Sequence, residues 1–360
     1  MIYILLILLV IILGVTIFVN TSPEFGASKI LMNKDKINKL DNYNNEKFSV
    51  DESTDGNITL STFIKFFMPK NTEPGKELPI VKLDKNYFDK TISQTRLTWF
   101  GHSTVMLEID KKKLLIDPVL SDYASPVKGY FVKPRYQPGL PLQAEDLPNI
   151  DAVLISHDHY DHLDYETIIK LKDKVSNFFV PLGVGSHLLE WGVDKSKIIE
   201  LNWWEDVKFE ELTLSFAPTR HFSGRGLTNK NSTLWGSWVI AGTEHNLYFS
   251  GDSGYSKYFK QIGDKYGPFD LTMVECGQYN EDWHSIHMTP EESVQANIDL
   301  QGDVMIPIHW SAFTLSLHTW NEPVKRAAKH AEKLKVNMLT PKIGQSIIIG
   351  EDNQTTDWWK

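Results

Sequence analysis

Residues 152–164 read AVLISHDHYDHLD, an apolar run followed at once by three histidines and three aspartates. The run predicts a buried strand, and YETIIKLKDK over 165–174 predicts a helix directly after the motif. Imidazole and carboxylate groups are preferred zinc ligands, and alternate side chains in a tight turn can converge on one point. We therefore expect metal binding at the end of this strand by His157, His159, Asp161 and His162.

Three further candidate ligands occupy the same position relative to other predicted strands. His221 follows TLSFAPTR, Asp252 follows LYFSG and His309 follows VMIPI. Alternating α/β folds gather their binding sites at the carboxyl ends of strands, so the repeated placement indicates one shared site. Cys276 is the only cysteine, which excludes an intrachain disulfide and a cysteine-rich zinc module. Any metal must be held by histidine and carboxylate.

Seven candidate ligands exceed the four that one tetrahedral zinc ion accepts, which indicates two metals. The first ion would take His157, His159 and His221. The second would take Asp161, His162 and His309, and Asp252 is left to bridge both. Two ions about 3.5–4 Å apart can bring the pKa of bound water toward neutrality. The sequence therefore predicts a dinuclear hydrolase with Asp161 and Asp252 among its catalytic residues.

The rest of the chain predicts an α/β domain. Short β-type runs begin at Arg96, and DKKK over 110–113 is a hairpin signal. Strands then alternate with helices, one of which starts at a capping box formed by Thr289, Pro290 and Glu292. Such alternation indicates layered packing with helices outside. We expect a polar lead-in wrapping the core over 21–92, a hydrolase domain over 93–350 and a short tail over 351–360.

Residues 1–19 read MIYILLILLVIILGVTIFV and contain no charged side chain. As a helix they are long enough to cross a bilayer, at ~1.5 Å per residue. A cleaved signal peptide is the alternative, but a basic n-region and an A-x-A-like cleavage site are both missing. We therefore expect a single-pass membrane anchor over 1–20. The lysines that follow, at 29, 34, 36 and 39, favour a catalytic domain on the cytoplasmic side.

The charge balance narrows the choice of partners. The chain carries 37 basic and 46 acidic residues, for a net charge of −9. A broad nucleic-acid surface needs clustered lysine and arginine, so we expect no nucleic-acid partner.

The H-x-H-x-D-H motif with a later histidine, aspartate and final histidine resembles the metallo-β-lactamase fold superfamily. Further segments resemble the N-acyl-phosphatidylethanolamine-hydrolysing phospholipase D family, among them LTWFGHSTVMLEID, ELNWWE, YFSGDSGY, HMTPEESV and IHWSAF. The resemblance implies a four-layer αβ/βα sandwich with metals at one edge. It also implies two Zn²⁺ ions, a membrane phospholipid substrate, release of N-acylethanolamine and phosphatidic acid, and a homodimer.

The same resemblance assigns substrate roles to two residues. Tyr160 inside the motif and His287 before the PEE helix would contact the substrate phosphate. For the leaving alkoxide we expect either His287 or a metal-bound water to supply the proton. His102 and Asp117 are expected to orient ligands. Arg225 either meets the phosphate or belongs to a loop, and the tryptophans of NWWE are expected to pack.

Two other functions stay open from the sequence. A different hydrolase on the same fold, such as a lactonase, would use the same metals on a carbonyl carbon. The other is a membrane-tethered metal-binding protein, which would have the intact metal ligands but would catalyse no reaction.

Overall fold

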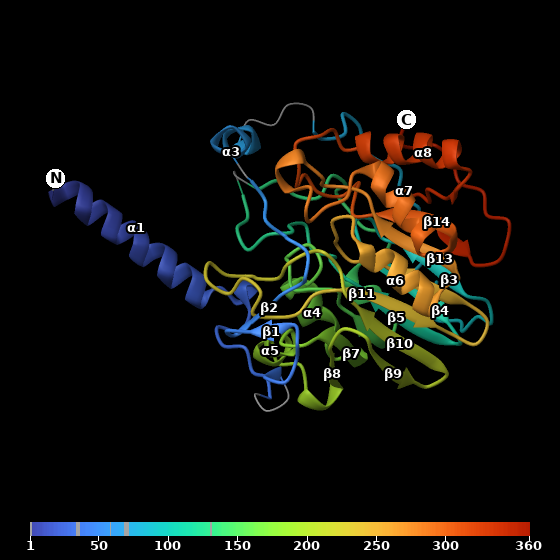
Figure 1. The fold of residues 1–360 in the computed structure, drawn as a ribbon, viewed down its shortest axis with the longest axis horizontal. Coiled ribbons are helices and arrows are strands. Elements are labelled where there is room, and N and C mark those ends of the chain that lie inside the picture. Colours follow the sequence, from blue (N-terminus) through green and yellow to red (C-terminus); the bar gives the residue numbers. More distant parts are fainter. Residues whose placement is uncertain (1, 34–36, 58, 68–71, 130–131) are drawn as a thin grey trace.

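The computed structural model describes residues 2–33, 37–57, 59–67, 72–129 and 132–360. Two sheets of seven strands lie face to face, with helices on their outer sides (Figure 1). The chain enters the first sheet, crosses to the second, and returns with its last strand to the first. This architecture confirms the predicted four-layer sandwich.

The first sheet has the order β16-β3-β4-β5-β6-β7-β8. Its strands are β3 (Arg96–Trp99), β4 (Val105–Ile109), β5 (Lys112–Ile116), β6 (Ile150–Leu154), β7 (Val175–Pro181), β8 (Ile198–Leu201) and β16 (Ser346–Ile348). Strands β16, β3, β4 and β5 pair antiparallel, and β5 to β8 pair parallel.

The second sheet has the order β15-β14-β13-β12-β11-β10-β9. Its strands are β9 (Glu205–Phe209), β10 (Leu212–Ala217), β11 (Ser237–Ala241), β12 (Asn246–Phe249), β13 (Phe269–Glu275), β14 (Gly302–Ile308) and β15 (Asn337–Met338). Strands β9 to β12 pair antiparallel, and β12 to β15 pair parallel. Parallel strands end at the same edge, which is where the candidate ligands were expected.

Alternating side chains divide the core around the first sheet. In β4, Val105 and Leu107 lie between the sheets, whereas Met106 lies on the outer side. In β5, Leu114 lies between the sheets and Leu115 outside. This is the two-residue period of a strand buried on both faces, which explains why these segments read as almost continuous apolar runs.

Helices cover both outer faces. Helices α4 (Tyr165–Leu171) and α5 (Gly185–Glu190) bury Ile168, Leu171 and Leu188 on the first sheet. Helices α6 (Lys257–Tyr266), α7 (Pro290–Asp299) and α8 (Glu322–Leu334) cover the second sheet. Short 3-10 turns lie at Pro23–Phe25, Ala144–Asp146, Lys195–Lys197 and Glu281–Trp283.

Two local predictions are confirmed by the backbone. The Thr289 side chain accepts from the Glu292 amide while the Glu292 carboxylate accepts from the Thr289 amide, which is a capping box with Pro290 at the first turn. In the β4–β5 hairpin, Asp110 and Lys111 both have positive φ, as a two-residue turn matched to strand twist requires. Helix α4 ends at Leu171, three residues before the predicted end.

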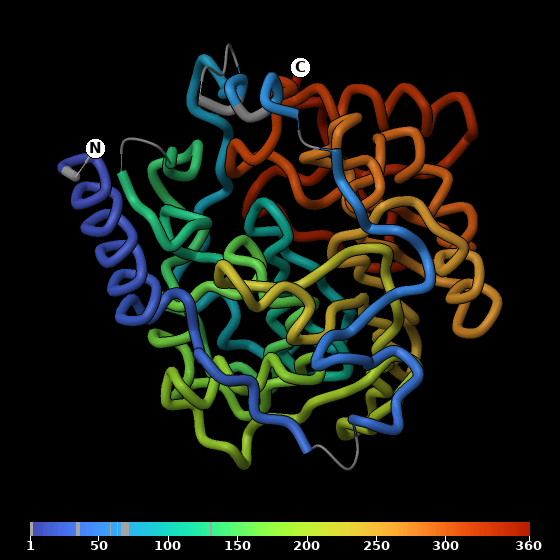
Figure 2. Tube along the Cα trace, turned by 60° about the vertical axis from the view of Figure 1, so that its left-hand side comes forward, coloured from blue at the N-terminus to red at the C-terminus, as the bar shows by residue number. Residues whose placement is uncertain are grey.

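The lead-in lies against the domain. Its elements are β1 (Tyr43–Asn44), β2 (Lys47–Phe48) and α3 (Leu60–Phe67). Figure 2 shows the segment after α1 running across one face of the domain before it reaches this hairpin. Phe48 is buried in the core between the sheets, and Ile80 bridges Ile343. The lead-in therefore contributes side chains to the core.

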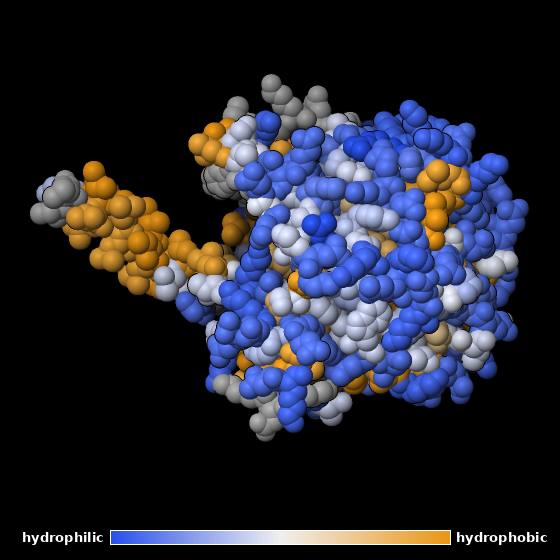
Figure 3. Space-filling model, viewed as in Figure 1, coloured by the Kyte–Doolittle hydropathy of each residue, from blue (hydrophilic) through white to orange (hydrophobic). Residues whose placement is uncertain are grey.

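Helix α1 (Ile2–Thr21) projects from the domain. Over Tyr3–Thr21 its mean hydropathy is 2.9 and none of it is buried, so by length and composition it can cross a membrane. Its surface is hydrophobic almost throughout, in contrast to the hydrophilic surface of the domain (Figure 3).

Candidate metal centre

The carboxyl ends of strands from both sheets meet at one edge. The motif loop 157–164 follows β6 of the first sheet. His221, Asp252 and His309 follow β10, β12 and β14 of the second. All seven predicted ligands gather there, in two adjoining groups, and a third group joins two of them, Asp252 and His309, to His287. Inside each group the donor atoms lie within 4.8 Å of one another.

The first group contains His157, His159, His221 and Asp252. His159 Nδ1 lies 2.9 Å from His157 Nε2 and 3.2 Å from His221 Nε2. His157 and His221 are fully buried, and His159 is partly exposed. Three imidazole nitrogens and one carboxylate oxygen thus surround a single point.

The second group contains Asp161, His162 and His309, and it also includes His102. Asp161 Oδ2 lies 3.1 Å from His309 Nε2 and 3.6 Å from His162 Nε2. His102 Nε2 lies 3.0 Å from the same oxygen. His102 was expected to support the ligands, and the structure brings its nitrogen as close to this group as the predicted ligands themselves.

Asp252 lies between the two groups. Its Oδ2 is 3.7 Å from the Nε2 atoms of both His157 and His221. The same oxygen is 3.2 Å from His162 Nε2 and 3.3 Å from His309 Nε2. One carboxylate therefore faces both sets of imidazoles.

Hydrogen bonds on the opposite ring nitrogen select the tautomer of several ligands. His162 Nδ1 lies 2.7 Å from Asp117 Oδ2, and His221 Nδ1 lies 3.0 Å from the Ile286 carbonyl. Because these oxygens accept, each Nδ1 carries the proton and each Nε2 presents its lone pair to the site. His157 Nδ1 is 2.9 Å from Ser156 Oγ.

Burial and the charges of neighbouring side chains shift the pKa values of the histidines and aspartates in the two groups. Burial lowers the pKa values of His157 and His221 well below the ordinary value. For Asp252, burial opposes ionisation, but the imidazoles of His162 and His309 outweigh it and hold the pKa well below its usual range. Burial thus favours neutral rings at His157 and His221. For His162 the charges of Asp252 and Asp161 outweigh burial and raise its pKa well above the ordinary value, so this ring must release a proton when a divalent cation binds.

The donor set fits a metal. His162 Nε2 and Asp252 Oδ1 are buried polar atoms without a hydrogen-bond partner among the described residues. Orphaned buried donors and acceptors are rare, and a bound ion is one accepted explanation for them. Imidazole with carboxylate is a common set for Zn²⁺ and other divalent metals.

The backbone at this edge adopts unusual conformations. His102, Asp117 and His309 have φ values of 52°, 40° and 66°. Left-handed conformations are uncommon for such residues and cluster at functional sites. Gly251 has φ 55°, and a Cβ there would lie 2.6 Å from the Gly236 carbonyl, so only glycine allows the turn that delivers Asp252.

The predicted substrate residues lie at the open side. His287 has a 13% exposed side chain, and its ring lies 5.1 Å from that of His221. Tyr160 is partly exposed, and its hydroxyl donates to the Arg225 carbonyl. Burial raises the pKa of Tyr160 to about 12.

Arg225 is a buried structural residue. Its Nη1 donates to the carbonyls of Asp158 and Leu163 at 2.6 and 2.7 Å, and its Nε donates to the Glu24 carbonyl at 3.0 Å. With its donors committed to the backbone, it does not offer them to a phosphate, so that alternative is wrong. The two tryptophans pack as expected, Trp203 against Trp235 and Trp204 on Tyr266.

Two features were missed from the sequence. Glu275 is a buried carboxylate at the end of β13, the same placement that identified the ligands. Asp158 lies within the motif and pairs with His187, whose Nε2 is 3.3 Å from Asp158 Oδ2. Strand-end position could have revealed Glu275, whereas the Asp158–His187 pair has no signal in the sequence.

A family model described as a β-lactamase superfamily domain matches residues 112–310. An uncharacterised protein of Mycobacterium tuberculosis is 44% identical over 286 residues, covering 78% of this chain and 76% of its own. The N-acyl-phosphatidylethanolamine-hydrolyzing phospholipase D 1 of Caenorhabditis elegans is 36% identical over 230 residues, covering 61% of this chain and 64% of its own.

Solved structures agree on the fold. A metallo hydrolase of the archaeon Ignicoccus hospitalis superposes with a TM-score of 0.53 at 20% identity, covering 72% of this chain and all of its own. At that identity the likeness bears on the architecture alone.

Proposed function

This chain belongs to the metallo-β-lactamase superfamily of metal-dependent hydrolases, and on that basis we propose that it is a zinc-dependent phospholipase D of membrane phospholipids. The substrate class we propose is N-acyl phosphatidylethanolamine. The products would be phosphatidic acid and N-acylethanolamine.

The observation that carries the proposal is the contact between the apolar helix and the wall of the metal centre. Phe18 in α1 packs edge-on against Phe25, with ring centroids 5.6 Å apart, and Phe25 packs against Tyr160 at 6.2 Å. Arg225 joins the Glu24 carbonyl to the carbonyls of Asp158 and Leu163 in the motif loop. If α1 spans the bilayer, the metal centre is held beside the membrane surface, where a phospholipid headgroup lies.

A groove of about 580 Å³ adjoins this contact. Its lining includes Val19, Phe25, Ile169, Trp191 and Leu227. Leu227 is 77% exposed. Its lining also includes polar residues such as Asn20, Glu190 and Asn229. A partly apolar, partly polar groove between anchor and domain agrees with a phospholipid substrate that stays in the bilayer.

Two Zn²⁺ ions fit the donor set. The first would be held by His157, His159 and His221, the second by Asp161, His162 and His309, with Asp252 shared. When bound, the pair would activate water and neutralise charge on the phosphoryl oxygens.

The chain's own groups would then act on the scissile bond. Water attacks phosphorus, the P–O bond to the ethanolamine oxygen breaks, and the alcohol leaves with a proton. His287, partly exposed beside His221, is positioned to donate that proton to the leaving oxygen. Tyr160 would form the side of the entrance, since its ring lies between Phe25 and the Arg225 guanidinium.

The relatives support this substrate class over others on the same fold. The Caenorhabditis elegans relative is an N-acyl-phosphatidylethanolamine-hydrolyzing phospholipase D by name, and so is a mitochondrial protein of Saccharomyces cerevisiae that is 31% identical over 69% of this chain and 55% of its own.

The test uses the full chain purified in detergent and incubated with vesicles of N-acyl phosphatidylethanolamine. We expect phosphatidic acid and N-acylethanolamine by mass spectrometry, with about two metals per chain. Asp252→Asn should abolish both products, and Asp110→Asn, a hairpin aspartate bonded to Thr243, should leave them unchanged.

The absence of lipid products would reject the proposed substrate. Turnover of a lactone by the same preparation would then assign a carbonyl-directed hydrolase. Metal binding without turnover of either class would assign a tethered metal-binding protein.

A further inference from the structure

Glu275 is a buried carboxylate among the metal ligands. It ends β13, which lies in the sheet between β12, the strand before Asp252, and β14, the strand before His309. Its amide donates to Ser250 Oγ at 2.9 Å, and its carbonyl accepts from Ser293 Oγ at 2.7 Å. The backbone of Glu275 is thus fixed on both sides, and its side chain emerges at the edge where the ligands meet.

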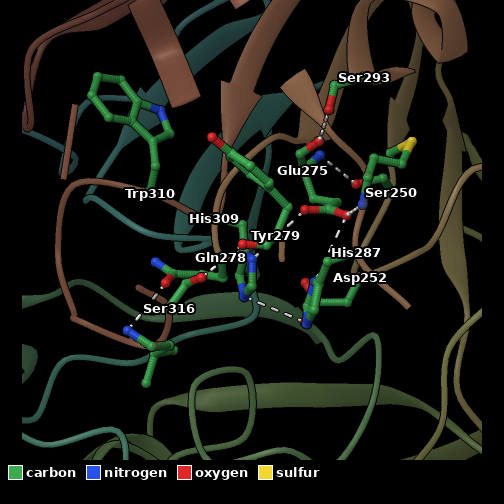
Figure 4. A network of polar contacts seen from close by, with 12 residues as sticks. Ser250, Asp252, Glu275, Gln278, Tyr279, His287, Ser293, His309, Trp310 and Ser316 are labelled. Atoms are coloured by element: carbon green, nitrogen blue, oxygen red, sulfur yellow. Dashed lines mark hydrogen bonds and ion pairs between the residues drawn. The ribbon is translucent and has the colours of Figure 1, made fainter. Parts of the chain in front are cut away.

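The two carboxylate oxygens face two different imidazoles. Oε1 accepts from the Met288 amide at 2.8 Å and lies 3.8 Å from His287 Nδ1. Oε2 lies 3.8 Å from His309 Nδ1. Figure 4 shows the carboxylate on one side of both rings, with a contact to each, and the rings stack with centroids 5.2 Å apart and planes 13° apart.

Three of these atoms are buried and unpaired among the described residues: Glu275 Oε2, His287 Nδ1 and His309 Nδ1. The ligands His162 and His221 have acceptors for the same nitrogen. A buried polar atom without a partner is costly, so Glu275 Oε2 and His309 Nδ1, which face one another across 3.8 Å, are natural partners. His287 Nδ1 lies 3.8 Å from Oε1, a carboxylate oxygen that can accept a second bond beside that from Met288.

We propose that Glu275 is a positioning residue that holds His309 and His287 together. Its carboxylate accepts from Nδ1–H of each ring, which turns Nε2 of His309 toward the metal and leaves Nε2 of His287 for the substrate. The role of His287 in this inference rests on the proposed function. One acid thereby aligns a metal ligand with the proton donor of the reaction.

The first test is a Co²⁺ titration of the metal-free full chain, followed by visible absorption. Glu275→Gln keeps the size of the side chain but replaces one carboxylate oxygen with an NH₂ group, which donates instead of accepting. Glu275→Met removes both carboxylate oxygens and adds no N–H donor. Both variants should bind the second Co²⁺ about 10–100-fold more weakly, with an altered spectrum. The control Glu108→Gln changes a buried carboxylate that pairs with Arg96 away from the site, and it should match the wild type.

The second test is a double-mutant cycle with His287→Gln on N-acyl phosphatidylethanolamine. Glu275→Gln should lower kcat more than it changes KM in the wild-type background. It should lower kcat less in the His287→Gln background, because one of the two rings through which it acts is gone.

Wild-type Co²⁺ affinity and spectrum in both Glu275 variants would overturn the proposal, as would additive effects in the cycle. Failure of both variants to fold while Glu108→Gln folds would assign a purely structural role and overturn it as well. If the wild type cleaves no lipid, the proposed function fails, and the Co²⁺ titration still decides whether Glu275 positions His309.

Discussion

Asp117 Oδ2 accepts a hydrogen bond from His162 Nδ1 at 2.7 Å. Through Ser156, the same carboxylate also helps to set the ring orientation of His157. The Ser156 hydroxyl donates to Asp117 Oδ2 at 2.5 Å, and its oxygen lies 2.9 Å from His157 Nδ1. His157 and His162 belong to different metal groups, so one buried carboxylate sets the ring orientation on both sides of the centre.

Asp117→Asn should therefore weaken the binding of both metals, by about 10–100-fold. The left-handed backbone at Asp117 is tolerated by asparagine, so the change acts on hydrogen bonding. Competition with a chelator, followed by metal analysis, measures the effect. The control is Asp110→Asn, which also replaces an aspartate with positive φ but lies in the β4–β5 hairpin, and this variant should bind metal as the wild type does. A normal affinity in Asp117→Asn would refute the orienting role.

Arg225→Lys should lower the free energy of unfolding by about 2–4 kcal/mol, because a single ammonium cannot serve three carbonyls on two separate segments and leaves buried acceptors unpaired. Urea denaturation in detergent measures this change. The matched control is Arg326→Lys on α8, where the pair with Glu291 is partly exposed and should contribute less than about 1 kcal/mol. Equal losses of unfolding free energy in the two variants would contradict the role of Arg225 in joining Glu24 to the motif loop.

Acid should destabilise the contact between the lead-in and the motif loop through His187. Its Nδ1 accepts from the Ala27 amide at 3.0 Å while its Nε2 faces Asp158, so only the neutral ring satisfies both bonds. Burial lowers the pKa of His187 in the folded state, and Asp158 opposes this only in part. The unfolded chain then binds more protons below the ordinary pKa, so this stability is present above about pH 6.5 and is lost as pH falls.

The measurement compares unfolding free energies at pH 7.5 and 5.5. His187→Gln should reduce the loss between these values by up to about 1.4 kcal/mol per pH unit below 6.5. His330→Gln, on α8, should leave the slope unchanged. If the unfolding free energy of His187→Gln changed with pH as much as that of the wild type, His187 would take up protons equally in the folded and unfolded states, which would contradict the prediction.

Helix α1 should hold the chain in membranes against an alkaline carbonate wash. Leu8→Asp with Ile11→Asp places two charges at the centre of the helix, each costing about 2.5–3.5 kcal/mol on insertion, and should release the chain. Asn20→Asp near the end of the helix should not. Retention of the doubly charged variant would point to attachment through other parts of the surface.

The sequence predicted the fold class and the gathering of seven ligands, because one local pattern, a polar residue after a buried strand, repeats at each ligand. Parallel strands end at one edge, so the pattern converts directly into proximity. The capping box at Thr289 and the hairpin at Asp110 are equally local and were equally readable.

Long-range relationships could not be read in this way. Arg225 looked available for a phosphate because its acceptors, including the Glu24 carbonyl 201 residues away, become visible only in the fold. Glu275 occupies a strand end like the ligands, but without a histidine nearby in sequence it read as an ordinary strand terminus. The return of β16 to pair with β3 likewise depends on tertiary contacts.

The most direct test of the central claim is hydrolysis of N-acyl phosphatidylethanolamine in ¹⁸O-labelled water by the full chain loaded with two zinc ions. Attack of water on phosphorus predicts one ¹⁸O in phosphatidic acid and none in N-acylethanolamine, with no product from Asp252→Asn. Label in N-acylethanolamine, or product formation that persists in Asp252→Asn, would contradict hydrolysis at phosphorus by the centre that Asp252 bridges.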